Sequence, residues 1–179
     1  MDTIEYIRNL INNGRKVGIF SCEDPLNAIF HKDVFNLGTY LHAHFTPGGV
    51  IEPYTLDLGL SHKHIDAWGV FCHYGEFNTK KVCGAVNALL KGYGDEGKDF
   101  KKYLDTLKIR FPLNKNNLLK ENVMSLIKSE YGFLLKNIKE KQKNFGLKKD
   151  VIVFAGIVYN LSEMNYKSEI LFESIVKWQ

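Results

Sequence analysis

The pattern of apolar and polar positions divides the chain into short buried strands and amphipathic helices. Apolar residues recur at helical spacing in the first residues, and Gly14 follows them, which predicts a helix at 1–13. Nearly continuous apolar runs predict buried strands at 16–21, 64–73 and 150–160. Runs of this kind are typical of parallel strands that are covered on both faces of a sheet.

The segments between these runs have less regular patterns. We expect a short strand at 33–37, an irregular stretch up to Pro53, helices at 54–60 and 84–91, a mostly helical region at 97–143 that breaks near Pro112, and a last strand or extended arm at 167–175. Strands that alternate with helices indicate an α/β fold with a mostly parallel central sheet flanked by helices. The length favours one domain over residues 1–179.

Composition and charge narrow the class of protein further. The chain is 45% hydrophobic and 25% charged, with a formal net charge of +4 and a pI near 8.8. No basic stretch is interleaved with a nucleic-acid motif, and no apolar run approaches the roughly eighteen residues that a membrane span needs. Three cysteines without an export signal indicate a reducing compartment, and we expect a cytoplasmic protein.

Two predicted strands end at residues that can bind a metal. Cys22 follows the first strand and His73 closes the strand at 64–73, while Cys83 stands just before a predicted helix. Ligand sites in such sheets lie beyond the carboxyl ends of strands, and zinc binds two thiolates and an imidazole well. Asp24 is close enough to be a fourth ligand or to regulate access. No CxxC pair is present, so the spacing alone favours small buried thiols and a core imidazole over a metal site.

The order of these motifs resembles that of the β-class carbonic anhydrases over about residues 15–160. "IFSCEDPL" is similar to the family's strand that ends in Cys-x-Asp-Ser-Arg, and "VFNLGTYLHAHFTPGGV" looks like a divergent Arg-Asn-Ala-Gly segment. "HIDAWGVFCH" and "VCGAVNALL" match the strand and helix that carry the family's His-x-x-Cys-Gly motif. "VIVFAGIVYNLSEMNYK" resembles the family's late strand pair.

The resemblance implies a zinc enzyme in which Cys22, His73 and Cys83 hold Zn²⁺ and Asp24 is catalytic. The implied reaction is the reversible hydration of carbon dioxide to bicarbonate by a metal-bound hydroxide, with Asp24 accepting a hydrogen bond from it. Members of the family form homodimers or larger homo-oligomers, and the helix at 1–13 would take part in that contact. No nucleic acid or membrane is implied as a partner.

The spacing of the predicted ligands departs from the family. Nine residues separate His73 from Cys83, where family members have two. We interpret residues 74–82 as an inserted loop that still allows both side chains to reach one ion. An alternative alignment places Lys80 at the histidine position and would remove one ligand.

A second departure concerns the partner of Asp24. The family's arginine, which holds the aspartate away from the metal, corresponds here to Leu26. Asp24 could then bind the zinc itself and close the site, or pair with another cation. The nearest candidates in sequence are Arg15, Lys80 and Lys81.

These departures leave two alternative functions open. The same fold and metal could act on carbonyl sulfide or carbon disulfide, or the chain could be a non-catalytic descendant with a structural zinc. For the enzyme, His42 and His44 are candidates for exporting the proton. We expect Cys72 to be a buried thiol on the strand face opposite His73, and His62 and His64 to lie in a turn or on the surface.

Overall fold

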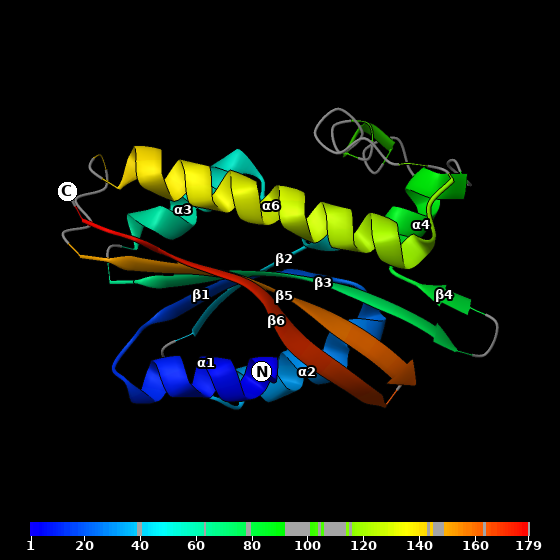
Figure 1. The fold of residues 1–179 in the computed structure, drawn as a ribbon, viewed down its shortest axis with the longest axis horizontal. Coiled ribbons are helices and arrows are strands. Elements are labelled where there is room, and N and C mark those ends of the chain that lie inside the picture. Colours follow the sequence, from blue (N-terminus) through cyan, green and yellow to red (C-terminus); the bar gives the residue numbers. More distant parts are fainter. Residues whose placement is uncertain are drawn as a thin grey trace.

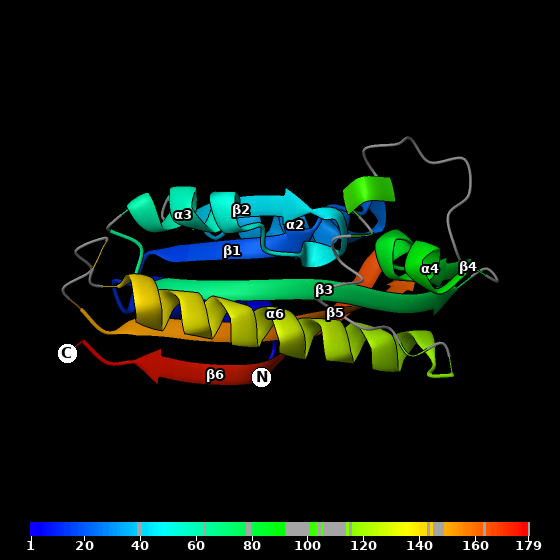
Figure 2. The same ribbon diagram turned by 90° about the horizontal axis from the view of Figure 1, so that it is seen from above.

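A single mixed sheet forms the centre of the molecule. The structure, a computed structural model, describes residues 1–38, 41–62, 64–77, 80–91, 101–103, 105, 114, 116–142, 144, 149–162 and 164–178. The six strands of the sheet in these residues are β1 (Val17–Cys22), β2 (Leu41–Thr46), β3 (Ala67–Phe77), β4 (Lys80–Val82), β5 (Val151–Ser162) and β6 (Asn165–Val176). Figure 2 shows the order β2-β1-β3-β5-β6 across the sheet.

The sheet combines parallel and antiparallel pairs. β1 pairs in parallel with β2 and β3, and β3 pairs in parallel with β5. β6 runs antiparallel to β5, and the short β4 runs antiparallel to the end of β3. The predicted α/β class is therefore confirmed, but the sheet is mixed. About two residues separate the strands of each antiparallel pair, which is too few for the crossover that a parallel pair needs.

Helices cover both faces of the sheet (Figure 1). α1 (Thr3–Asn12) and α2 (Ala28–Phe35) lie on one face, while α3 (Pro53–Ser61), α4 (Gly84–Lys91) and α6 (Leu119–Lys141) lie on the other. Two 3₁₀ turns, η1 (Pro25–Asn27) and η2 (Pro47–Gly49), follow β1 and β2. None of the helices in these described ranges has the length and apolar character needed to cross a membrane.

Strand alternation produces a separate apolar core on each face. On β1, Phe20 packs with Trp68 on the α6 side, whereas Ile19 faces α1 and α2. All eight residues from Val151 to Val158 are buried, which explains why their segment has no polar alternation. The continuous apolar runs in the sequence therefore identified central strands correctly.

Three predicted boundaries were wrong. Residues 33–37 lie mostly in α2, where the buried Phe30 and Val34 have the i, i+4 spacing of a helix rather than of a strand. The stretch predicted to be irregular contains β2, and β3 continues past His73 to Phe77. The helices at 54–60 and 84–91 and the helix within 97–143 are confirmed by α3, α4 and α6, although most of 97–118 lies outside the described residues.

Candidate metal centre

The turn after β2 holds the first candidate ligand, Cys22, in place. Cys22 is the last residue of β1 and pairs with Thr46, so the η2 turn passes directly beside its side chain. The backbone N–H of Gly48 donates to the Cys22 sulfur at 3.2 Å. Gly48 has φ +71°, a conformation that glycine adopts at little cost. The sulfur of Cys22 is thus buried and supported by a backbone donor.

The second candidate ligand, His73, is fixed by an asparagine from β5. The side-chain oxygen of Asn160 lies 2.7 Å from His73 Nδ1, so Nδ1 carries the proton and donates to it. His73 is fully buried, and its Nε2 has no hydrogen-bond partner among the described residues. Burial lowers the pKa of His73, but the Cys22 sulfur and the Asp24 carboxylate outweigh it and raise this pKa. A buried imidazole nitrogen that makes no hydrogen bond is free to bind a metal ion.

The third candidate ligand, Cys83, is returned to the site by a hairpin. β3 extends beyond His73 and β4 runs back along it, so that Gly75 pairs with Val82 immediately before Cys83. The predicted inserted loop is therefore built from paired strands on both sides. Cys83 is fully buried and has φ +86°, which is unusual for a residue other than glycine and costs of order 1–3 kcal/mol. Such strain is typical of positions where the side chain is needed.

These three side chains converge. One ligand atom from each of Cys22, His73 and Cys83 lies within 4.8 Å of the others, and all three residues are buried. His73 pairs with Val158, and strand alternation places it on the sheet face opposite Cys22. Cys22 is the last residue of β1, so the imidazole meets its sulfur at the end of that strand. The structure thus brings together the three predicted ligands. The sulfurs of Cys22 and Cys83 and the Nε2 of His73 fit a zinc ion.

The thiols of this cluster are protonated when no metal is bound. The Cys83 side chain and burial raise the pKa of Cys22 well above its usual value. Cys22 lowers the pKa of Cys83, but Cys72 and burial outweigh it and raise that pKa as well. A metal that binds here must therefore displace two thiol protons.

Asp24 lies at the edge of this cluster. Its Oδ2 is 3.6 Å from His73 Nε2, the ring atom that faces the cluster. Its Oδ1 accepts from the backbone N–H of Leu26 at 3.0 Å and caps the η1 turn. Asn160 also donates to the backbone oxygen of Leu26, so one residue links the η1 turn to the His73 ring.

The other sequence candidates have different positions. Cys72 is buried on the face opposite His73, as predicted, yet its sulfur lies 3.8 Å from that of Cys83. Arg15 pairs with Asp66 at 3.4 Å, near the start of β1 and away from Asp24. The side chains of Lys80 and Lys81 lie outside the described residues.

The candidate proton shuttles are displaced along the sheet. His42 pairs with Gly18 near the start of β1, and His44 pairs with Phe20, so both lie before the Cys22–Thr46 pair along the strands. The His44 ring stacks on Phe20, with 5.1 Å between ring centroids. Neither histidine belongs to the cluster around Cys22.

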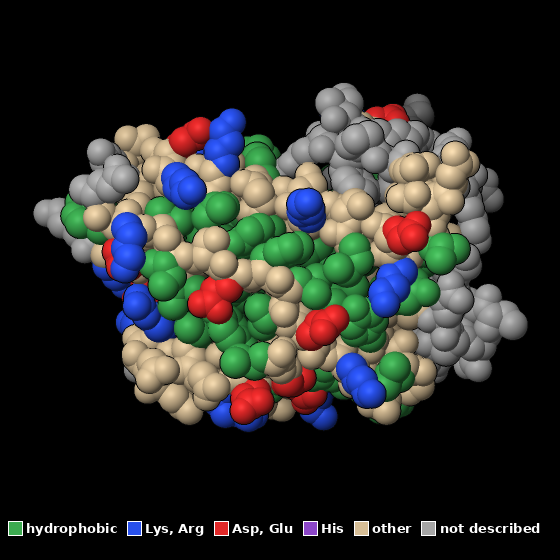
Figure 3. Space-filling model, viewed as in Figure 1, with side chains coloured by type: hydrophobic (Ala, Val, Ile, Leu, Met, Phe, Trp, Pro, Cys, Tyr) green, Lys and Arg blue, Asp and Glu red, His purple; other side chains and the backbone are tan. Residues whose placement is uncertain are grey.

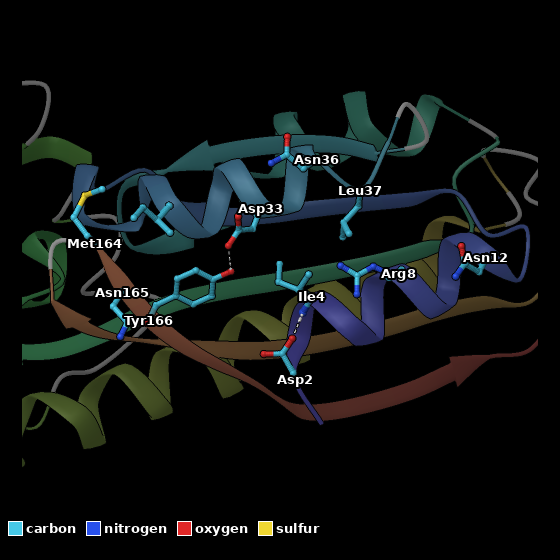
Figure 4. Close-up of a pocket in the computed structure, with 11 residues that line it drawn as sticks. Asp2, Ile4, Arg8, Asn12, Asp33, Asn36, Leu37, Met164, Asn165 and Tyr166 are labelled. Atoms are coloured by element: carbon cyan, nitrogen blue, oxygen red, sulfur yellow. Dashed lines mark hydrogen bonds between the residues drawn. The ribbon is translucent and has the colours of Figure 1, made fainter.

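A groove of about 750 Å³ lies elsewhere, between α1 and α2 (Figure 4). Asp33 and Tyr166 face each other within it and share a hydrogen bond of 2.7 Å. Arg8 and Asp2 contribute charge from α1 and the residue before it. None of the candidate zinc ligands lines this groove.

Sequence reasoning missed three polar groups, two of which contact the candidate ligands directly. Asn160 orients His73, the Gly48 N–H supports Cys22, and the buried Glu130 of α6 accepts from the backbone N–H of Ile51 at 2.8 Å. The signal for Asn160 was a polar residue within an otherwise apolar strand. Glu130 carried no comparable signal, because acidic residues are common on helices.

Comparisons with known proteins match the fold over almost the whole chain. No family model matches the chain, and no curated protein does either. The solved structure of PtLCIB4, a homolog of the limiting CO₂-inducible protein LCIB, superposes with a TM-score of 0.69 at 14% identity, covering 99% of this chain and 91% of that one. LCIB itself gives 0.63 at 12% identity, with 99% and 93% covered.

A carbonic anhydrase has the same fold. The wild-type β-carbonic anhydrase CafD of the filamentous fungus Aspergillus fumigatus gives a TM-score of 0.53 at 12% identity, covering 88% of this chain and 90% of that one. The likeness thus extends over most of both chains. The chain has the fold shared by LCIB, its homolog and a β-carbonic anhydrase, as the motif order predicted.

Proposed function

We propose that the chain is a divergent β-carbonic-anhydrase-like zinc lyase that reversibly hydrates carbon dioxide to bicarbonate. The observation that carries this proposal is the convergence of Cys22, His73 and Cys83 within 4.8 Å at the end of β1. The shared fold with the β-carbonic anhydrase CafD supports the same reaction class. The match to LCIB, named as a limiting CO₂-inducible protein, supports a role in carbon dioxide metabolism.

The ligand residues are well prepared to hold a zinc ion. Asn160 accepts from Nδ1 of His73 and so leaves Nε2 as the metal-binding atom. The Gly48 N–H stabilises negative charge on the Cys22 sulfur. Zinc supplies Lewis acidity, which lowers the pKa of water towards neutrality.

Asp24 is the residue that would act on the reacting water. Its Oδ2 would accept a hydrogen bond from that water and orient a lone pair towards the carbon of carbon dioxide. Its Oδ1 is held by the N–H of Leu26, which fixes the direction of the carboxylate. Apolar residues packed around Cys22 and Cys83 would exclude bulk water and favour a small uncharged substrate.

A closed, structural zinc site is the second candidate. Asp24 Oδ2 lies only 3.6 Å from the same Nε2 that would bind the metal, and Leu26 stands where the family has its arginine. A fourth protein ligand would leave no position for water, and the zinc would then only stabilise the fold. The two candidates predict opposite effects of Asp24→Asn.

The first test measures zinc content and carbon dioxide hydration in matched variants. Zinc-loaded wild type should hydrate carbon dioxide in stopped-flow assays between about pH 7 and about pH 9, and Cys22→Ala or Cys83→Ala should abolish both zinc binding and activity. Cys72→Ala removes the third cysteine, only 3.8 Å from Cys83, and should retain both. Asp24→Asn should keep its zinc and lose activity by about 100-fold or more.

Other outcomes would contradict the proposal. Wild type that binds zinc but shows no hydration at any of these pH values would favour the structural site, as would activity that appears only in Asp24→Asn. Hydrolysis of carbonyl sulfide or carbon disulfide without carbon dioxide hydration would keep the metal and change the substrate. Wild type that binds no zinc would rule out all three readings.

A further inference from the structure

A second group of metal-binding side chains lies at the opposite end of the sheet. His42, His62 and His64 each offer a ring nitrogen, and these atoms lie within 4.8 Å of one another. The ring centroids are 4.3 Å apart for His42 and His62, and 5.7 Å apart for His64 and either of the other rings. The reaction proposed at Cys22 uses none of these residues.

Two separate elements bring the three rings together. His42 lies in β2 beside Gly18, four residues before the Cys22–Thr46 pair. At a rise of about 3.3 Å per residue, this separates the two clusters by roughly 13 Å along the strands. His62 and His64 follow α3, in the connection that leads to β3. The histidine cluster is therefore distinct from the cluster at Cys22.

The spacing of the rings suits a transition metal. Zinc–imidazole bonds of about 2.0–2.1 Å place tetrahedral ligand nitrogens about 3.4 Å apart, so the rings must close by at most about 1.4 Å. His42 and His62 are half-buried and His64 is exposed, which leaves room for side-chain rotation and access for an ion. Three imidazoles without a thiolate favour Zn²⁺, Cu²⁺ or Ni²⁺ over calcium or magnesium.

Two lysines influence the cluster from outside. Burial, Lys16, His62 and Lys149 lower the pKa of His64. The Lys149 ammonium is partly neutralised, because it pairs with Asp66 at 3.1 Å while it donates a hydrogen bond to the backbone oxygen of His64 at 3.0 Å. Burial and the neighbouring His62 and His64 rings lower the pKa of His42. A neutral imidazole is the form that binds a metal.

We propose that His42, His62 and His64 form a second, tri-histidine site for a divalent transition metal. An ion there would connect β2 to the segment after α3. In the described residues β2 pairs only with β1, so its other side is an edge of the sheet. The metal would fasten this edge strand to the helix layer and so stabilise the fold, without taking part in chemistry at Cys22.

Titration with Zn²⁺ alone separates the two sites. Wild type should bind a second Zn²⁺ ion that the double variant His62→Gln/His64→Gln does not bind at the same concentration. The affinity of the double variant for this second ion should be at least about 100-fold lower, because the loss of an outer-shell partner alone already costs about 10–100-fold. His31→Gln removes a histidine from a different place, beside Ser21, and should retain the second equivalent. Cobalt at the second site should lack the sulfur-to-metal absorption expected at Cys22 and Cys83.

Ring ¹⁵N shifts identify the ligands directly. Binding of the second Zn²⁺ ion should change the ¹⁵N chemical shifts of the ring nitrogens of His42, His62 and His64. It should also raise the melting temperature of the wild type but not that of the double variant. If the double variant unfolds, the single variant His64→Gln gives the same comparison, because His64 is exposed and its replacement should not disturb the fold. Unchanged zinc stoichiometry and affinity in these variants, or shifts confined to other histidines, would overturn the proposal. Because Cys22→Ala should keep the second site, the two metal proposals can fail independently.

Discussion

Asn160 shows how a single polar side chain can organise a buried site. It accepts from His73 Nδ1 at 2.7 Å and donates to the backbone oxygen of Leu26 at 2.8 Å. One amide thereby selects the ring tautomer of His73 and links it to the turn that carries Asp24. Outer-shell partners of this kind set both the orientation and the basicity of a metal-binding histidine.

Removing this amide should therefore weaken metal binding without unfolding the protein. We expect Asn160→Ala to reduce zinc affinity by about 10–100-fold, measured by competition with a chromophoric chelator. Asn160→Asp keeps an acceptor for Nδ1 and should restore most of the affinity. Asn137→Ala removes an amide that donates a hydrogen bond to Phe133 within its own helix, away from the candidate ligands, and should not change zinc affinity. Equal affinity in Asn160→Ala and wild type would show that the amide has no such role.

His31 should make stability depend on pH. Asn27 Nδ2 can only donate, and it lies 3.2 Å from His31 Nε2, so the ring accepts there and is neutral. Burial, with a smaller contribution from His73, lowers the pKa of His31 to about 4. The unfolded chain binds this proton near pH 6.5, so the stability that neutral His31 provides is complete above that pH. It is lost as the pH falls from about 6.5 to about 4.

Urea denaturation at several pH values measures this effect. The free energy of unfolding of wild type should fall between about pH 6.5 and about pH 4 more steeply than that of His31→Gln. Identical slopes for the two proteins would mean that His31 titrates normally.

At the scale of elements, the η2 turn is closely confined by the strands beside it. Gly49 has φ +71°, and a Cβ added there would lie 2.3 Å from the backbone oxygen of Phe71 and 3.2 Å from the N of Cys22. Gly14 has a similar φ of +78°, but an added Cβ would meet no atom within 4 Å. A side chain at Gly14 would therefore suffer only from the backbone conformation, whereas one at Gly49 would also overlap with neighbouring atoms.

Alanine at these two glycines should therefore have unequal effects. Gly14→Ala should cost about 1–2 kcal/mol for the left-handed conformation alone, and Gly49→Ala should cost at least about 1–3 kcal/mol more. Because the turn also supplies the Gly48 N–H, Gly49→Ala should weaken zinc binding as well, whereas Gly14→Ala should not. Chemical denaturation and a zinc titration test both points, and equal losses of stability would contradict them.

The elements differ in how well the sequence predicted them. Continuous apolar runs identified β1, β3 and β5, because strands buried on both faces have no polar positions. β2 was missed because two histidines interrupt its apolar residues, and α2 was misread because a short helix and a short strand share local composition. Motif order predicted the three candidate ligands that the fold groups together, and their metal binding stays a prediction. Asn160 and Glu130 were missed because their roles depend on contacts across the fold that spacing cannot reveal.

At the scale of the whole molecule, β6 exposes an edge of the sheet. It pairs with β5 alone among the described strands, and apolar side chains gather on the molecular face that carries it (Figure 3). Ile175 of β6 is 52% exposed. An exposed apolar edge strand is a natural surface for association with another copy.

We therefore predict a homo-oligomer that assembles through β6. Ile175→Lys should shift the sedimentation coefficient to that of a monomer, because a buried unpaired ammonium opposes association. Leu58→Lys changes a similarly exposed apolar residue on α3, at 49% exposure, and should leave assembly intact. A wild type that sediments as a monomer, or equal assembly of Ile175→Lys and wild type, would exclude this interface.

The β3–β4 hairpin has a consequence for finding similar chains. Because paired strands return Cys83 to His73, the number of residues between the two can grow by lengthening both arms of the hairpin while the ends stay together. Proteins with the same trio of ligands can thus differ widely in linear spacing, and a search for a fixed His-x-x-Cys pattern would pass over them. A search that allows a strand pair of any length at this point should recover them.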